Sequence, residues 1–169
     1  MPKNAKNLAN FVDKFKGKRI AVVGDLMLDH FIFGDIDRIS PEAPVPVLLA
    51  KEDTMVPGGA GNVATNLAAL GAKPVIFAVV GTDEAAPKLL AELKKRGVST
   101  MGVIVDKSRP TTQKTRVVAR NQQLVRIDRE KTDYIDKKIE DKILAIFVRQ
   151  IKSFDGVAIS DYTKGFITK

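Results

Sequence analysis

The sequence has no cysteine and no tryptophan, and it has one histidine, His30. The absence of cysteine excludes disulfides and any zinc or iron–sulfur centre bound by cysteine. With one histidine, neither a histidine-based metal centre nor a Ser-His-Asp triad is expected, so we predict no metal site. No apolar run reaches the length of a membrane span, and no apolar segment follows the basic N-terminus as in a secretory signal. We therefore expect a cytoplasmic protein that does not contact membranes.

The 169 residues correspond to one ordinary domain, and 44% hydrophobic content is enough to form a core. Lysine and arginine exceed aspartate and glutamate by 28 to 20, and much of this excess lies in residues 107–131. That segment has no aromatic side chains on which bases could stack. It is better interpreted as a basic β-ribbon over a pocket for a phosphorylated metabolite. A basic nucleic-acid-binding module is the alternative from another class.

A glycine cluster at residues 57–61 leads directly into an alanine-rich amphipathic segment. Glycine lets the backbone approach a ligand closely, and the free N–H groups of a following helix favour oxygen-rich or anionic ligands. The cluster is not a Walker A loop, because Gly61 is followed by Asn62 rather than lysine, and it matches the dinucleotide fingerprint poorly. A flexible turn with Asn62 as a simple N-cap would also explain the pattern.

Apolar runs predict three strands buried on both faces of a parallel sheet, and periodic apolar residues predict three helices between them. An aspartate follows each strand, and ligands in open α/β sheets bind at the carboxyl ends of strands. Asp83 also precedes a helix and could cap it instead. The strands are 19–23, 75–80 and 157–159, the helices are 61–70, 84–96 and 133–152, and the aspartates are Asp25, Asp83 and Asp161.

Two segments interrupt this alternation of strands and helices. Residues 31–56 contain three prolines between Pro41 and Pro46, which exclude a central strand and predict an extended or edge segment. Residues 103–129 contain β-forming residues around a turn at 119–122. We expect both to form a small separate sheet that covers the crevice as a lid and excludes water.

Three strings in this order resemble the N-terminal half of ribokinase-type carbohydrate kinases. They are Val-Val-Gly-Asp-x-x-x-Asp from residue 22, Pro-Gly-Gly-Ala-Gly-Asn-Val-Ala from residue 57 and Val-Gly-x-Asp from residue 80. Longer segments at 38–47, 120–128 and 160–165 are similar to the D-glycero-β-D-manno-heptose-7-phosphate kinases of this family. The resemblance implies an α/β fold: a partial ribokinase-like sandwich, with a mostly parallel core sheet flanked by helices and a small β-sheet lid.

The resemblance also implies an activity. Such kinases use ATP and Mg²⁺ to phosphorylate the anomeric hydroxyl of D-glycero-D-manno-heptose 7-phosphate, on the route to ADP-heptose and lipopolysaccharide core. They are often fused to an adenylyltransferase domain, and the lid commonly forms a homodimer contact. The implied partners are a small sugar phosphate and a second copy of the chain, and nucleic acid is not expected. A ribokinase-type kinase for another sugar is an alternative.

The family's binding residues can be carried over to matching positions of this sequence. Ionised carboxylates would accept hydrogen bonds from sugar hydroxyls, and guanidinium groups would bind the 7-phosphate in forked, charge-assisted pairs. The nearby Arg120 and Arg129 are better interpreted as solvated edge charges, and Asp29 could merely cap a turn. The substrate-binding residues implied are Asp25, Asp29, Gly58, Gly59, Asn62, Arg116, Asn121, Gln123, Arg126 and Lys164.

Two motifs of these kinases do not occur in the sequence. One is Gly-Ala-Gly-Asp, whose aspartate is the general base, and the other is Asn-x-x-Glu, which serves magnesium and ATP. The similar string at residues 59–62 ends in Asn62, and an amide cannot act as the base. We therefore expect residues 1–169 to be the N-terminal part of a kinase domain without its C-terminal ATP-binding half. The chain would contain no catalytic residue, bind no ATP or Mg²⁺ fully, and be inactive alone.

Overall fold

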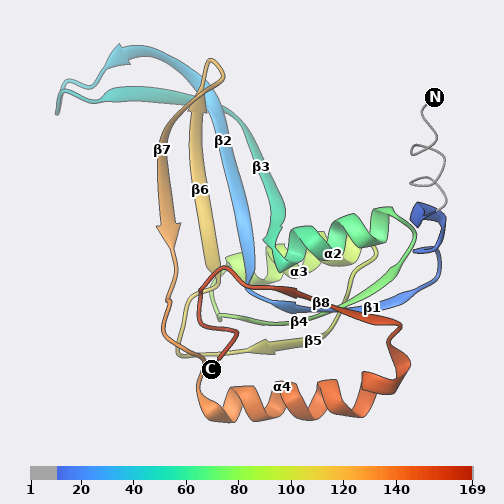
Figure 1. Cartoon of the computed structure of the whole chain (residues 1–169). Helices are drawn as coiled ribbons and strands as arrows, with labels where there is room; N and C mark the ends of the chain where they lie inside the picture. The colour runs from blue at the N-terminus through green and yellow to red at the C-terminus, as the bar shows by residue number, and fades with distance from the viewer. Residues whose placement is uncertain (1–10, 169) are drawn as a thin grey trace.

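The apolar runs form a four-stranded parallel sheet at the centre of the molecule (Figure 1). The computed structural model describes residues 11–168 of the chain. Strands buried on both faces favour continuous apolar sequence, and the three expected strands all lie in this sheet. In spatial order its strands are β5 (Ser99–Val105), β4 (Lys73–Val80), β1 (Arg19–Gly24) and β8 (Gly156–Ser160).

Helices cover both faces of this core sheet. On one face, α2 (Ala60–Ala69) and α3 (Ala85–Lys95) bury Leu89 and Leu93 against the strands. On the other, α4 (Lys137–Gln150) and Phe154, which follows the 3₁₀ turn η1 (Ile151–Ser153), pack over Phe77, whose ring meets Phe147 edge to face at 5.2 Å. The three expected helices are thus confirmed, within a few residues at each end. No helix within residues 11–168 has the length and apolar character needed to cross a membrane.

A second four-stranded sheet stands at the carboxyl ends of the core strands (Figure 1). β2 is an inner strand of this sheet, because it pairs antiparallel with β3 on one side and parallel with β6 on the other. The prolines expected to exclude a central strand lie in the tip at residues 41–45 and at the first position of the edge strand β3. The spatial order is β3 (Pro46–Gly59), β2 (Leu26–Ile39), β6 (Thr112–Ala119) and β7 (Gln122–Arg129).

The lid bounds expected from the sequence need correction. The first excursion leaves the core at Leu26 rather than at residue 31, because β2 follows β1 after a single residue. Residues 103–105 belong to the core strand β5, so the second excursion begins at Thr112. The expected turn is confirmed: Ala119 pairs with Gln122 in a two-residue connection between β6 and β7.

Candidate functional site

Asp25 follows β1 and is almost completely buried, at 3% exposure. Its carboxylate accepts hydrogen bonds from the backbone N–H groups of Tyr162, Lys164 and Phe166, at 2.7, 3.1 and 3.3 Å. Both carboxylate oxygens are therefore engaged by the loop that follows β8. This geometry makes Asp25 the anchor of that loop, and the sugar contact implied for it stays a prediction.

Asp29 and Arg116 meet at the base of the lid. The parallel pairing of β2 and β6 brings them together, and Arg116 Nη1 donates to Asp29 Oδ1 at 2.6 Å. Each side chain is 21% exposed, and the guanidinium carbon lies 5.1 Å from the centre of the Phe31 ring. The other oxygen of Asp29 lies directly over Gly58, where a Cβ atom would overlap it. Three residues carried over from the family are thus in one place.

Gly59 joins the lid to α2 and is the N-cap residue of that helix, with φ of 55°. A Cβ atom there would overlap the carbonyl oxygen of Asp25, which accepts a hydrogen bond from the N–H of Ala60 at 2.9 Å. The glycine is therefore required by backbone packing. The alternative in which Asn62 caps the helix is wrong, because Asn62 lies within α2 with its side chain exposed.

An alternating chain of charges runs from the loop after β8 across the base of β6 and β7. Lys164 Nζ lies 2.8 Å from one oxygen of Glu130, and Lys114 Nζ lies 3.2 Å from the other. Lys114 also lies 2.8 Å from Asp128, which pairs with Arg126 Nε at 3.0 Å. Two residues carried over from the family, Lys164 and Arg126, are the ends of this chain.

Glu130 and Lys114 were missed by the sequence reasoning, although they hold the chain together. The hydrogen bond from Lys164 lowers the pKa of Glu130; burial opposes this shift and Lys114 adds to it. The hydrogen bond from Lys114 likewise lowers the pKa of Asp128 against the effect of burial, with help from Arg126. Both carboxylates are therefore ionised at neutral pH. The pairing of Lys114 with Asp128 across β6 and β7 is a signal that a register prediction could have found.

Two other implied residues lie farther from this base. Asn121 is in the β6–β7 turn, with φ of 66°, and borders a cavity near the tip of the lid together with Lys51. Gln123 lies on β7, where it pairs with Val118 of β6 and is exposed. The structure does not bring Asn121 or Gln123 to the Asp29 and Arg116 pair, so their contact with substrate stays a prediction.

The segment 107–131 is less positive than its sequence suggests. Lys114, Arg116 and Arg126 are paired with carboxylates, and Arg109 is buried at 8% exposure. Arg109 pairs with Asp106 at 3.1 Å and donates to the backbone carbonyl groups of Lys164 and Asp133. Nearby carboxylates thus offset part of the positive charge of this β-ribbon.

The other two aspartates that follow core strands have local partners. Asp83 accepts hydrogen bonds from the backbone N–H of Thr111 at 2.6 Å and of Ala85 at 3.1 Å. Burial opposes ionisation of Asp83, but these hydrogen bonds outweigh it and lower the pKa. Asp161 is exposed and accepts from Thr163 N–H at 2.8 Å. Asp83 therefore ties the start of α3 to the segment before β6, from the position just before the N-cap residue Glu84.

The expectation that this chain binds neither ATP nor Mg²⁺ fully stays a prediction. In the part of the chain that the structure describes, no three side chains of His, Cys, Asp or Glu gather as metal ligands. The sequence also lacks the family's two motifs for ATP, magnesium and the base. We therefore assign no chemical step to either group here.

A parallel sheet covered by helices, with a β-lid at its carboxyl edge, defines the ribokinase-like α/β class. The chain belongs to the pfkB family of carbohydrate kinases, which it matches over residues 18–168. Solved structures agree: a putative ribokinase from Agrobacterium tumefaciens superposes with a TM-score of 0.62 at 23% identity, over 85% of this chain and 44% of that one. A carbohydrate kinase from the same organism gives 0.62 at 21% identity, over 84% and 45%. The fold class expected from the sequence is confirmed.

Curated relatives are more similar in sequence. A protein named Bifunctional protein HldE from Nitratiruptor sp. is 48% identical over 151 residues, which are 89% of this chain and 32% of the relative. The protein of that name from Hyphomonas neptunium is 42% identical over 164 residues, 97% and 34% respectively. The chain thus spans about a third of the length of these relatives. The recognition of the family is confirmed.

Proposed function

We propose that this chain is the sugar-phosphate-binding part of an ATP-dependent kinase acting on D-glycero-D-manno-heptose 7-phosphate. The observation that carries this proposal is the ion pair between Asp29 and Arg116. The pair lies over Gly58 and is partly buried at the base of the lid. The choice of heptose is supported by the resemblance at residues 38–47, 120–128 and 160–165, and by relatives named Bifunctional protein HldE. Such kinases lead to ADP-heptose for the lipopolysaccharide core.

The site suits a ligand with hydroxyl groups and a phosphate. The carboxylate of Asp29 accepts from hydroxyls, and Arg116, Arg126 and Lys164 offer charge-assisted donors to phosphate. Each of these three cations is held by a carboxylate: Asp29, Asp128 and Glu130 respectively. A phosphate would share or replace these partners, so the cations are oriented before the ligand arrives.

Phosphotransfer needs more residues than this chain supplies, so we propose that residues 1–169 are inactive alone. A second half of the kinase domain, carrying the general base and the site for ATP and Mg²⁺, would complete the active site. The edge strand β8 is a suitable place for such a half, because Val157 and Ile159 are 48% and 70% exposed there. Steady formation of ADP that depends on the sugar phosphate, by the pure 169-residue chain, would contradict this part of the proposal.

Three further proposals follow from the same assignment. A homodimer through the lid is supported by exposed Leu124, Val125 and Ile127 on β7, and sedimentation of the Val125→Asp variant would test it. A cytoplasmic location follows from the phosphorylated substrate and ATP. Nucleic acid is disfavoured as a partner because five of the eight cations in residues 107–131 are paired with carboxylates.

The binding proposal is tested by calorimetric titration of the chain with the heptose 7-phosphate and with the unphosphorylated heptose. We expect Arg116→Ala to weaken binding of the phosphate about tenfold or more, and binding of the free sugar much less, because only the phosphate loses a charged contact. Arg149→Ala, which removes an exposed cation on α4, is the matched control and should change neither. Equal losses for both ligands, or no loss, would contradict the phosphate role of Arg116.

The same titrations separate the alternatives. Tighter binding of another sugar phosphate would favour a ribokinase-type kinase for that sugar. Binding of an oligonucleotide tighter than about micromolar at physiological salt, falling steeply as salt rises, would favour a nucleic-acid-binding module.

A further inference from the structure

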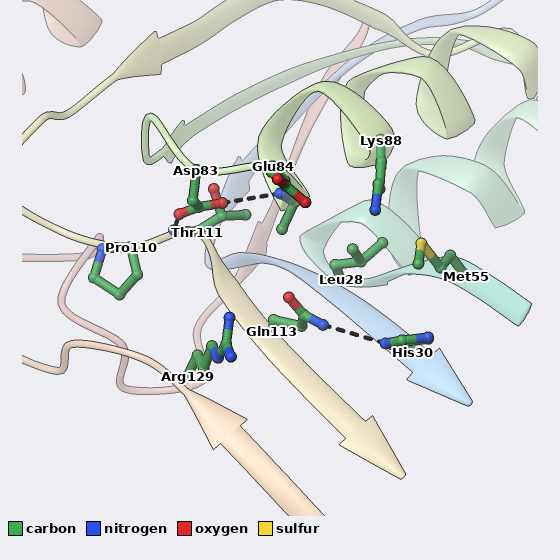
Figure 2. Close-up of a pocket in the computed structure, with 11 residues that line it drawn as sticks. Leu28, His30, Met55, Asp83, Glu84, Lys88, Pro110, Thr111, Gln113 and Arg129 are labelled. Carbon is green, nitrogen blue, oxygen red and sulfur yellow. Dashed lines mark hydrogen bonds between the residues drawn. The ribbon is translucent and has the colours of Figure 1, made fainter. Parts of the chain in front are cut away.

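A second cavity lies on the face of the lid opposite Asp29 and Arg116. Successive side chains of a strand point to opposite faces, so Leu28 and His30 of β2 line this cavity while Asp29 points to the other side. The cavity has a volume of about 400 Å³. Its walls are the lid on one side and the first turn of α3 on the other, as Figure 2 shows. It therefore lies at the junction between lid and core.

Two cations reach this cavity from opposite walls. Lys88 extends from α3, and Arg129 extends from the end of β7 (Figure 2). Within residues 11–168 neither forms an ion pair, whereas Arg116 and Arg126 on the other face are both paired. Two cations without carboxylate partners, on either side of a cavity, are suited to hold one anion. Arg129 is exposed on the edge strand β7, as expected from its sequence, and it also borders this cavity.

The lid wall also presents a hydrogen-bond acceptor. The amide nitrogen of Gln113 lies 3.0 Å from Thr115 Oγ1 and 3.3 Å from His30 Nδ1, so both of its protons have partners. His30 Nδ1 also lies 3.4 Å from Thr115 Oγ1, and with Nδ1 as the acceptor of this cluster Nε2 donates to Asp53 Oδ1 at 2.5 Å. The carbonyl oxygen of Gln113 is left to accept from a ligand.

The core wall adds a second acceptor. Asp83 is already engaged by the backbone N–H groups of Thr111 and Ala85, so it does not compete for the two cations. Glu84 keeps an exposed carboxylate beside the cavity (Figure 2). Leu28, Met55 and Pro110 supply an apolar surface between these polar groups. The cavity thus combines two cations, two acceptors and an apolar floor.

We propose that this cavity is a second ligand site, which binds a small phosphomonoester that also carries hydroxyl groups. The phosphate would lie between Lys88 and Arg129, and the hydroxyls would donate to Gln113 and Glu84. Because the ligand would touch both walls, it would bridge the lid and the first turn of α3. The site is independent of the sugar-phosphate site proposed above.

The test is NMR titration of the ¹⁵N-labelled 169-residue chain with glycerol 3-phosphate, which has the required phosphate and hydroxyls. Glycerol is the uncharged comparison. We expect glycerol 3-phosphate to shift the side-chain amide of Gln113 and the backbone amides of residues 84–88, with a dissociation constant of about 10 mM or tighter. The double variant Lys88→Gln/Arg129→Gln should weaken this binding about tenfold or more.

Two other variants make the result specific. Lys142→Gln/Arg149→Gln removes the same charge from exposed positions of α4, on the other face of the core sheet, and should leave the binding unchanged. Arg116→Gln alters the opposite face of the lid and should also leave it unchanged. The proposal is overturned if these amides do not shift at about 20 mM ligand, if glycerol shifts them equally, or if the α4 variant weakens binding as much. Loss of binding in Arg116→Gln alone would assign the ligand to the sugar-phosphate site instead.

Discussion

At the scale of single residues, burial and hydrogen-bond partners distinguish carboxylates that look equivalent in the sequence. Asp25 and Asp29 lie four positions apart in one motif, yet only Asp29 has an oxygen free of backbone donors. Asp25 instead accepts three N–H groups from a loop more than 130 residues away. The more exposed of the two is therefore the better candidate for contact with a ligand.

Asp25→Asn should reduce the free energy of unfolding by about 1–3 kcal/mol, because an amide cannot accept on both sides and its NH₂ group would face a backbone N–H. Chemical denaturation of both proteins measures the change. Asp161→Asn is the control, since that exposed side chain accepts only from Thr163 in its own loop. If both substitutions reduce the free energy of unfolding equally, Asp25 has no special role as an anchor of the loop after β8.

Gly58→Ala should weaken binding of the heptose 7-phosphate while leaving the fold intact. The added methyl group overlaps the Asp29 carboxylate, which must turn away from Arg116. Gly156→Ala in β8 is the matched control, because its Cβ would meet only Ile20 at an ordinary 3.5 Å. Circular dichroism and calorimetric titration would check both variants, and unchanged binding in Gly58→Ala would argue against this arrangement.

At the scale of elements, apolar periodicity was enough to predict the strands and helices of the core. It could not place the lid strands correctly, because β2 begins one residue after β1 and most of its residues are partly buried or exposed. The residues that gather at the two sites were harder to predict than the strands. Pairing of Lys114 with Glu130 and Asp128 depends on strand register, and the cavity beside Gln113 gathers residues from five separate segments. The first arrangement could be predicted only from the register of the β6–β7 hairpin, and no local pattern in the sequence predicts the second.

The β6–β7 turn offers a test at this scale. Arg120 and Asn121 both have positive φ, 47° and 66°, as a two-residue hairpin of type I′ requires. Asparagine tolerates this conformation better than arginine, so Arg120→Asn should stabilise the chain by about 0.5–1 kcal/mol. Thermal unfolding measures the gain, with Arg149→Asn on the exposed side of α4 as a comparison that should give none. A loss of stability in Arg120→Asn would mean that the turn adopts another conformation.

At the scale of the whole molecule, one buried ion pair joins three loops beneath the lid. Arg109 pairs with Asp106 after β5, and it donates to the carbonyl groups of Asp133 before α4 and Lys164 after β8. The two side chains are 6% and 5% exposed. Loops that meet at the carboxyl edge of the sheet are therefore held in place by a single guanidinium group. The loop after β8, which Asp25 anchors, is therefore also held by Arg109.

Asp106→Asn should cost about 3–5 kcal/mol of unfolding free energy at neutral pH, because it leaves the charge of Arg109 buried without a partner. Burial opposes ionisation of Asp106, but hydrogen bonds from Ser108 and the charge of Arg109 outweigh it and lower the pKa below 3.8. A lowered pKa contributes stability that is complete above the unfolded value and is lost as the pH falls through the folded one.

The difference between wild type and Asp106→Asn should therefore be largest above the ordinary aspartate pKa of about 3.9 and shrink as the pH falls below it. Denaturation curves across this range measure it. Glu42→Gln, which alters an exposed carboxylate at the tip of the lid, should differ little from wild type at any pH. A constant difference for Asp106→Asn at every pH would show that the loss comes from packing, and that the ionised pair does not hold the three loops together.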